Sequence, residues 1–109
     1  MIPKKHRFTT RVGEDFFAKA KRAYSPLFIL YFQKKETRKM AEVAVIVPKK
    51  HAPKATKRNK IKRKMKLVLK PLLPSLKGLG IVLYLKKRVE AEDFANFEKE
   101  INYLVEKIK

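Results

Sequence analysis

Hydrophobic residues recur along this chain at two spacings, one typical of strands and one typical of helices. Three apolar runs predict strands, at residues 25–33, 42–47 and 79–85. The first two runs are separated by the charged segment 34–39, so we expect them to pair as an antiparallel hairpin. The first run is apolar at consecutive positions, which predicts a strand that is covered on both faces.

Three other segments show helical spacing. The first is 13–23, where Glu14 and Asp15 stand at the end that the helix dipole makes favourable for acids. The second is 56–70, with Thr56 as the expected N-cap. Its apolar stripe consists of Ile61, Met65, Val68, Leu69 and Leu72. The third is 91–108, and its stripe consists of Phe94, Phe97, Ile101, Leu104, Val105 and Ile108.

The order of these segments predicts a single-domain α/β sandwich of the α+β class that spans residues 1–109. We expect the order α-β-β-α-β-α, with room for one extra short strand after the second strand. A chain of 109 residues is long enough for one hydrophobic core and too short for two.

Charge is distributed unevenly over this plan. The formal net charge is +19, which exceeds what solubility requires and indicates a polyanionic partner. Residues 43–89 contain fifteen basic residues and no acid, whereas residues 90–109 contain six acids and three lysines. We therefore expect one part of the surface to face the polyanion and the last helix to face mostly away from it.

Several kinds of site lack the residues that they need. The chain has no cysteine and only two histidines, His6 and His51, so we expect no metal site on the protein. Both histidines are interpreted as ordinary surface or turn residues. The apolar runs are far shorter than the roughly 20 residues that cross a bilayer, and residues 1–8 do not resemble a signal peptide. The expected location is the cytoplasm.

The predicted helix 56–70 combines a buried stripe with a strongly basic outer face. A merely solvated face usually carries compensating acids, and this one carries none. A membrane-surface helix usually contains Trp or Phe on its apolar side, and the stripe has neither. Contact with a polyanion is the interpretation that we favour over these two.

The order of elements and four sequence motifs resemble the bacterial ribonuclease P protein subunit over nearly the whole chain. These motifs are "PKKHRF" at 3–8, "SPLFILYF" at 25–32, "VAVIVPKK" at 43–50 and "KATKRNKIKRKMK" at 54–66. The last is the specific one, because the family signature is arginine-asparagine-arginine followed by a lysine-arginine pair. Here Lys60 replaces the second arginine, and Ala20 stands where the family usually has an aromatic residue.

The resemblance implies a non-catalytic protein subunit of an endonuclease. In this family a catalytic RNA removes the 5′ leader of precursor tRNA, using magnesium ions held mainly by the RNA. The implied partners are that RNA and precursor tRNA. We expect no membrane or DNA partner and no cofactor bound by the protein alone, and no protein partner is evident from the sequence. The resemblance also implies a left-handed crossover in the strand-helix-strand unit that contains the signature helix.

The resemblance also assigns residues to two surfaces. Those expected to bind the catalytic RNA are Lys49, Lys50, Lys54, Lys57, Arg58, Asn59, Lys60, Lys62, Arg63 and Lys66. Those expected to bind the leader are Phe16, Phe17, Ile29, Tyr31 and Ile46. Ile29 and Ile46 are equally compatible with plain core positions, whereas a tyrosine that is fully buried needs a hydrogen-bond partner.

Two other functions share the charge and the lack of catalytic groups. A small basic ribosomal protein that binds ribosomal RNA is the main alternative. A sequence-specific DNA-binding protein is less consistent with the chain, since no helix-turn-helix spacing or dimerisation seam is evident. The kind of nucleic acid that copurifies with the protein separates the three.

Overall fold

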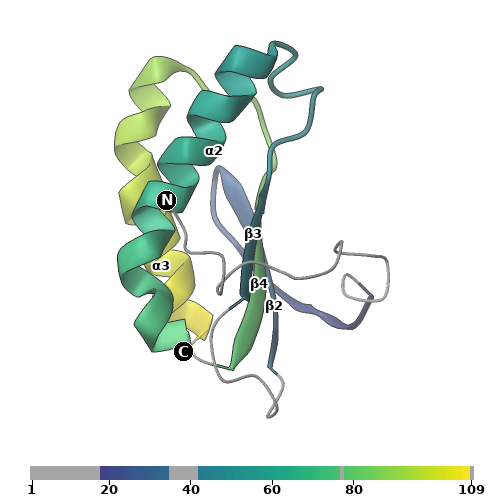
Figure 1. The fold of residues 1–109 in the computed structure, drawn as a ribbon, viewed down its shortest axis with the longest axis vertical. Helices are drawn as coiled ribbons and strands as arrows, with labels where there is room; N and C mark the ends of the chain where they lie inside the picture. Colours follow the sequence, from purple (N-terminus) through teal and green to yellow (C-terminus); the bar gives the residue numbers. More distant parts are fainter. Residues whose placement is uncertain (1–17, 35–41, 77, 109) are drawn as a thin grey trace.

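A four-stranded sheet forms the centre of the molecule (Figure 1). The computed structural model describes residues 18–34, 42–76 and 78–108. In spatial order the strands are β1 (Lys21–Tyr24), β2 (Phe28–Lys34), β4 (Leu79–Leu85) and β3 (Glu42–Ile46). Strand β4 pairs with β2 in antiparallel orientation and with β3 in parallel orientation.

The predicted hairpin between 25–33 and 42–47 is wrong, because β4 lies between β2 and β3. Strand β4 has buried residues on both faces, so a central place in the sheet removes the most apolar surface from water. The parallel pairing of β3 with β4 requires a crossover connection, and α2 supplies it. The strand-helix-strand unit that the resemblance implies is therefore present.

The predicted helix 13–23 is wrong at its end, because Lys21, Arg22 and Ala23 belong to β1. Strand β1 pairs with β2 in antiparallel orientation, with Lys21 opposite Phe32 and Tyr24 opposite Ile29. Ladder pairing with a long apolar strand outweighs the helical preference of this short segment. Strand β1 is thus the extra short strand of the predicted order, although it precedes the other strands. Residues 13–17 of the predicted helix lie outside the described residues.

Helix α2 (Ala55–Leu69) continues into the 3₁₀ helix η2 (Lys70–Leu76). Its predicted stripe is confirmed, since Ile61, Met65, Val68 and Leu69 are buried and Leu72 packs against the core. The expected cap at Thr56 is wrong, because the helix begins after Lys54 and no side chain caps it. Gly78, with φ of 83°, makes the turn from η2 into β4.

The predicted C-terminal helix is divided into η3 (Ala91–Asn96) and α3 (Phe97–Ile108). The backbone N–H of Glu90 donates to Asp93 Oδ2 at 2.7 Å and fixes the start of η3. The predicted apolar stripe is confirmed as a whole. Its buried members are Phe97, Ile101, Leu104 and Val105, and its partly buried members are Phe94 and Ile108.

Helices α2 and α3 lie together on one side of the sheet (Figure 1). The core fills the space between these helices and the sheet, and it includes Phe28 and Leu30 from β2. The rings of Phe28 and Phe97 meet edge to face with centroids 5.0 Å apart, which anchors α3 on β2. This arrangement confirms the α+β class, with helices on a sheet and the described order β-β-β-α-β-α.

Candidate nucleic-acid interface

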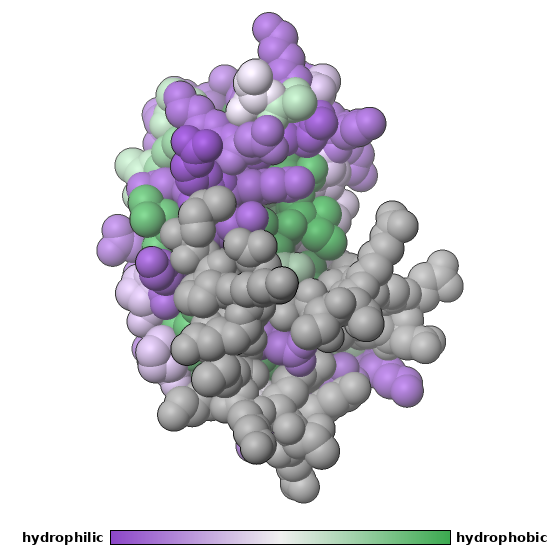
Figure 2. Space-filling view, viewed as in Figure 1, coloured by the Kyte–Doolittle hydropathy of each residue, from purple (hydrophilic) through white to green (hydrophobic). Residues whose placement is uncertain are grey.

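The outer side of α2 is a basic surface that the core positions. Because its apolar stripe is held against the sheet, the helix turns Asn59, Lys60 and Arg63 outward, and all three are exposed. Lys62 and Lys66 are half-buried beside them. Hydrophilic side chains cover the upper part of the molecule in Figure 2, where Figure 1 places the beginning of α2.

Arg58 connects this surface to the turn before the helix. Its Nη1 donates to the backbone oxygens of Ala52 at 3.1 Å and Pro53 at 2.8 Å. Lys57 Nζ lies 4.0 Å from Glu90 Oε2, so a neighbouring acid offsets part of the positive charge of Lys57. These two signature-helix cations therefore have partners within the protein.

The basic surface begins before α2, in a turn at residues 48–51 that we call the basic turn. The backbone N–H groups of His51 and Ala52 both donate to the Pro48 oxygen, at 3.0 and 3.2 Å, and close the turn. Lys49 and Lys50 are exposed on it. Lys54, at the start of α2, is exposed as well.

The end of β4 brings further positive charge to the basic turn. Lys86, Lys87 and Arg88 follow β4, which runs parallel to β3, the strand that precedes the turn. Burial lowers the pKa of His51, and the charges of Lys50 and Arg88 lower it further. Arg88 is thus near enough to the basic turn to act electrostatically on its histidine.

The sheet face away from α2 and α3 carries aromatic side chains, and we call it the tyrosine face. By the strand registers, its residues are Arg22, Tyr24, Ile29, Tyr31, Gln33, Glu42, Ala44, Ile46, Val82, Tyr84 and Lys86. Phe28 packs against α3, so by alternation the neighbouring Ile29 points to the opposite side of the sheet. The pairing places Tyr24, Ile29, Tyr84 and Ile46 in one row across all four strands.

Cations and rings are paired on the tyrosine face. The Tyr31 and Tyr84 rings meet edge to face with centroids 6.3 Å apart. Arg22 Cζ lies 5.3 Å from the Tyr31 ring centre, and Lys86 Nζ lies 5.7 Å from that of Tyr24. Rings that can stack on bases, next to cations that can bind phosphates, are typical of a surface that binds single-stranded nucleic acid.

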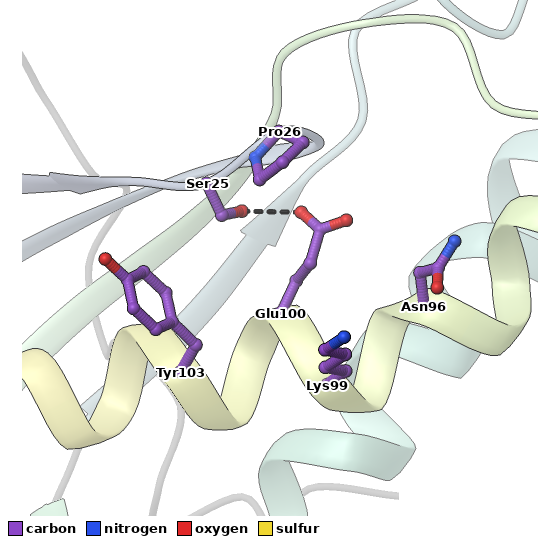
Figure 3. A pocket seen from close by; sticks show the side chains of 6 residues that line it. All are labelled: Ser25, Pro26, Asn96, Lys99, Glu100 and Tyr103. Carbon is purple, nitrogen blue, oxygen red and sulfur yellow. Dashed lines mark hydrogen bonds between the residues drawn. The ribbon is translucent and has the colours of Figure 1, made fainter.

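A third feature is a shallow pocket between α3 and the turn that joins β1 to β2 (Figure 3). Glu100 Oε1 accepts hydrogen bonds from Ser25 Oγ at 2.7 Å and from the Leu27 backbone N–H at 2.8 Å. Tyr103 and Lys99 also line the pocket. The carboxylate of Glu100 thus fixes the turn that follows Tyr24.

Among residues 18–34, 42–76 and 78–108, no three histidine, cysteine, aspartate or glutamate side chains are grouped so that they could hold a metal ion. No helix in the same ranges is long and apolar enough to cross a bilayer.

The structure assigns the predicted site residues to two surfaces. Nine of the ten basic-region residues lie on the basic turn and α2, and the tenth, Lys54, is the N-cap of α2. Ile29, Tyr31 and Ile46 lie half-buried on the tyrosine face. Phe16 and Phe17 lie outside the described residues. Sequence reasoning missed Tyr24, Tyr84 and Lys86, although alternation within 79–85 could have placed Tyr84 on a defined face.

Comparison with protein families decides what these surfaces belong to. The family model described as Ribonuclease P matches residues 2–109. The chain belongs to the Ribonuclease P family. This assignment implies an RNA partner, the ribonuclease P RNA, and a part in tRNA processing. A search among curated proteins finds none that matches.

Solved structures of two ribonuclease P proteins share the fold. The protein from Staphylococcus aureus has 18% identity and a TM-score of 0.79, and the match covers 95% of each chain. The protein from Thermotoga maritima has 24% identity and a TM-score of 0.74, covering 94% of this chain and 99% of that one. At this level of identity the likeness concerns the fold.

Proposed function

We propose that this chain is the non-catalytic protein subunit of a ribonuclease P holoenzyme. It binds the catalytic RNA through the basic turn and α2, and it binds the 5′ leader of precursor tRNA on the tyrosine face. By holding both, it favours endonucleolytic removal of the leader by the RNA. Magnesium ions are held mainly by the RNA in this proposal, since phosphate oxygens are hard ligands of the kind that Mg²⁺ prefers.

One observation carries the leader assignment. Tyr31 and Tyr84 are half-buried on the sheet face opposite the helices, and Arg22 lies over the Tyr31 ring. A base that stacks on either ring would have a cation nearby for its phosphate. A ring that served only the core would instead be expected among the residues between the sheet and the helices.

The charge of α2 supports the RNA assignment. Its fifteen residues include seven lysines and arginines and no acid. The positive end of the helix dipole adds to this charge. Phosphate groups of a structured RNA are the ligands that such a surface favours.

The test compares precursor tRNA with mature tRNA, which has no leader. In a holoenzyme reconstituted with the catalytic RNA, Tyr31→Ala should weaken precursor binding by roughly 1 to 3 kcal/mol, about fivefold or more. Binding of mature tRNA should stay near wild type. Equal weakening of both substrates, with an unchanged circular dichroism spectrum, would overturn the leader assignment.

A matched control is Tyr103→Ala, because Tyr103 is an exposed tyrosine on α3 and not on the sheet. The RNA that copurifies with the protein tests the rest of the proposal. A ribonuclease P RNA supports it, whereas ribosomal RNA as the dominant species would favour the alternative of a small ribosomal protein.

A further inference from the structure

Tyr24 stands out on the tyrosine face because it is 51% exposed. It lies on the edge strand β1, directly opposite Ile29. Ile29 in turn lies opposite Tyr84, so the two tyrosines flank Ile29 in the same row. Neighbouring strands are about 4.8 Å apart, so Tyr24 and Tyr84 stand roughly 10 Å from each other and each can receive its own base.

A cation accompanies this ring. Lys86 lies two residues after Tyr84, and its backbone N–H donates to the Leu27 oxygen at 3.0 Å. This bond holds Lys86 beside β2, and its Nζ extends to 5.7 Å from the Tyr24 ring centre. Like Arg22 beside Tyr31, Lys86 thus places a cation near a tyrosine ring, although it reaches Tyr24 from the far side of β2.

The backbone that carries the Tyr24 ring is fixed by hydrogen bonds in the turn that follows it. Tyr24 is followed by a turn in which Glu100 accepts hydrogen bonds from the Ser25 hydroxyl (Figure 3) and from the Leu27 backbone N–H. The Ser25 N–H donates to the Phe28 oxygen at 2.9 Å and closes the same turn. A ring on a fixed backbone loses less conformational entropy when it stacks on a ligand.

We propose that Tyr24 and Lys86 form an additional nucleotide site at the β1 edge, which lengthens the stretch of leader that the protein binds. Tyr24 stacks on one base of the single-stranded leader, and Lys86 binds an adjoining phosphate. This proposal rests on the proposed function, because it assumes that the tyrosine face holds the leader.

The experiment measures holoenzyme affinity for precursor tRNAs whose leaders are shortened one nucleotide at a time. In the wild type, affinity rises with leader length until the last site is filled. In Tyr24→Ala the rise should stop one nucleotide earlier, with a final affinity about five- to tenfold lower. Tyr24→Phe, which keeps the ring, should follow the wild-type curve.

Two further variants make the result specific. Lys86→Ala should reduce the slope of log K against log salt concentration by about 0.7, and only for leaders long enough to reach the site. Tyr103→Ala is a matched control, because Tyr103 is 54% exposed and also has a lysine Nζ 5.7 Å from its ring centre. It should leave the whole curve unchanged.

Tyr31→Ala separates failure of this inference from failure of the proposed function. If Tyr31→Ala weakens precursor binding while Tyr24→Ala and Lys86→Ala follow the wild-type curve, the edge site does not exist and the proposed function stands. If Tyr31→Ala also has no effect in a natively folded protein, the leader assignment and the edge site are both wrong. Should Tyr24→Ala perturb the fold, Lys86→Ala decides the question.

Discussion

Arg58 shows how one side chain can serve both the fold and the interface. It belongs to the basic signature that the sequence assigns to RNA, and its guanidinium also donates to the oxygens of Ala52 and Pro53. No side chain caps α2, and these bonds connect the first turn of the helix to residues 52 and 53, which lie between the basic turn and the helix. Arginine suits both tasks, since its planar group has five donors.

Replacing Arg58 should therefore affect stability and binding together. We expect Arg58→Ala to lower the free energy of unfolding by about 1 kcal/mol, since its two bonds are partly exposed, and to weaken binding of the catalytic RNA. Lys62→Ala should weaken binding without this reduction in stability. Urea denaturation and RNA titration of the two variants check this difference, and equal stability of both variants would contradict it.

His51 should report the approach of RNA to the basic turn. Burial and the charges of Lys50 and Arg88 keep its pKa below the usual value in the free protein. Phosphates that approach the turn would favour the protonated ring, so the pKa should rise on binding and affinity should increase as the pH falls through it. An NMR titration of the free and bound protein measures the shift, with His6→Gln assigning the signals.

Lower pH should strengthen RNA binding but should weaken the fold of the free protein, because the pKa of His51 is lowered in the folded state. The unfolded chain takes up the proton more readily, so the folded state loses stability as the pH falls below about 6.5. An unchanged pKa on RNA binding would place the basic turn outside the interface.

At the scale of elements, α3 holds the turn between β1 and β2 through one carboxylate. Glu100 accepts hydrogen bonds from Ser25 Oγ and from the Leu27 backbone N–H. Strand β1 has only four residues and lies at the sheet edge, so the geometry of this turn decides how well it pairs with β2.

Removal of this carboxylate should therefore cost stability. We expect Glu100→Ala to lower the free energy of unfolding by about 1 to 3 kcal/mol, because the partly buried Leu27 N–H loses its acceptor. Glu100→Gln keeps an acceptor oxygen and should cost less. Glu98→Ala is the matched control, since Glu98 is exposed on the same helix. Equal effects of the alanine variants in urea denaturation would contradict this role.

For the whole molecule, the net charge of +19 is less informative than its distribution. Helices α2 and α3 lie side by side over the sheet, yet α2 contains no acid whereas α3 contains Glu98, Glu100 and Glu106. The polyanion is therefore expected to meet α2 and the basic turn, and α3 is expected to face away from it.

Salt dependence tests this division. The double variant Lys60→Ala with Arg63→Ala should reduce the slope of log K against log salt by about 0.7 to 0.9 for each phosphate that the protein no longer neutralises. The matched double variant on α3, Lys99→Ala with Lys107→Ala, removes the same charge and should leave the slope unchanged. A similar reduction of the slope in both would mean that attraction depends on net charge alone.

The sequence by itself determined the elements whose pattern is local. The period of its apolar residues predicted β4 at 79–85, the buried stripe of α2 and the stripe of α3. It also determined the basic segment and the family, because charge and motif are read along the chain without knowledge of tertiary structure. For the same reason it placed Ile29 and Tyr31 on one strand face.

Only the tertiary structure decided which strands are neighbours. Strand β4 lies between β2 and β3 because this position buries both of its faces. The free energy of that burial comes from residues far apart in the chain, so a short sequence segment does not reveal it. This position puts Tyr84 beside Tyr31 and brings Lys86 to Tyr24, which is far earlier in the chain. Strand pairing therefore assembles the tyrosine face. The sequence around each of its residues does not show which residues of other strands will lie beside it.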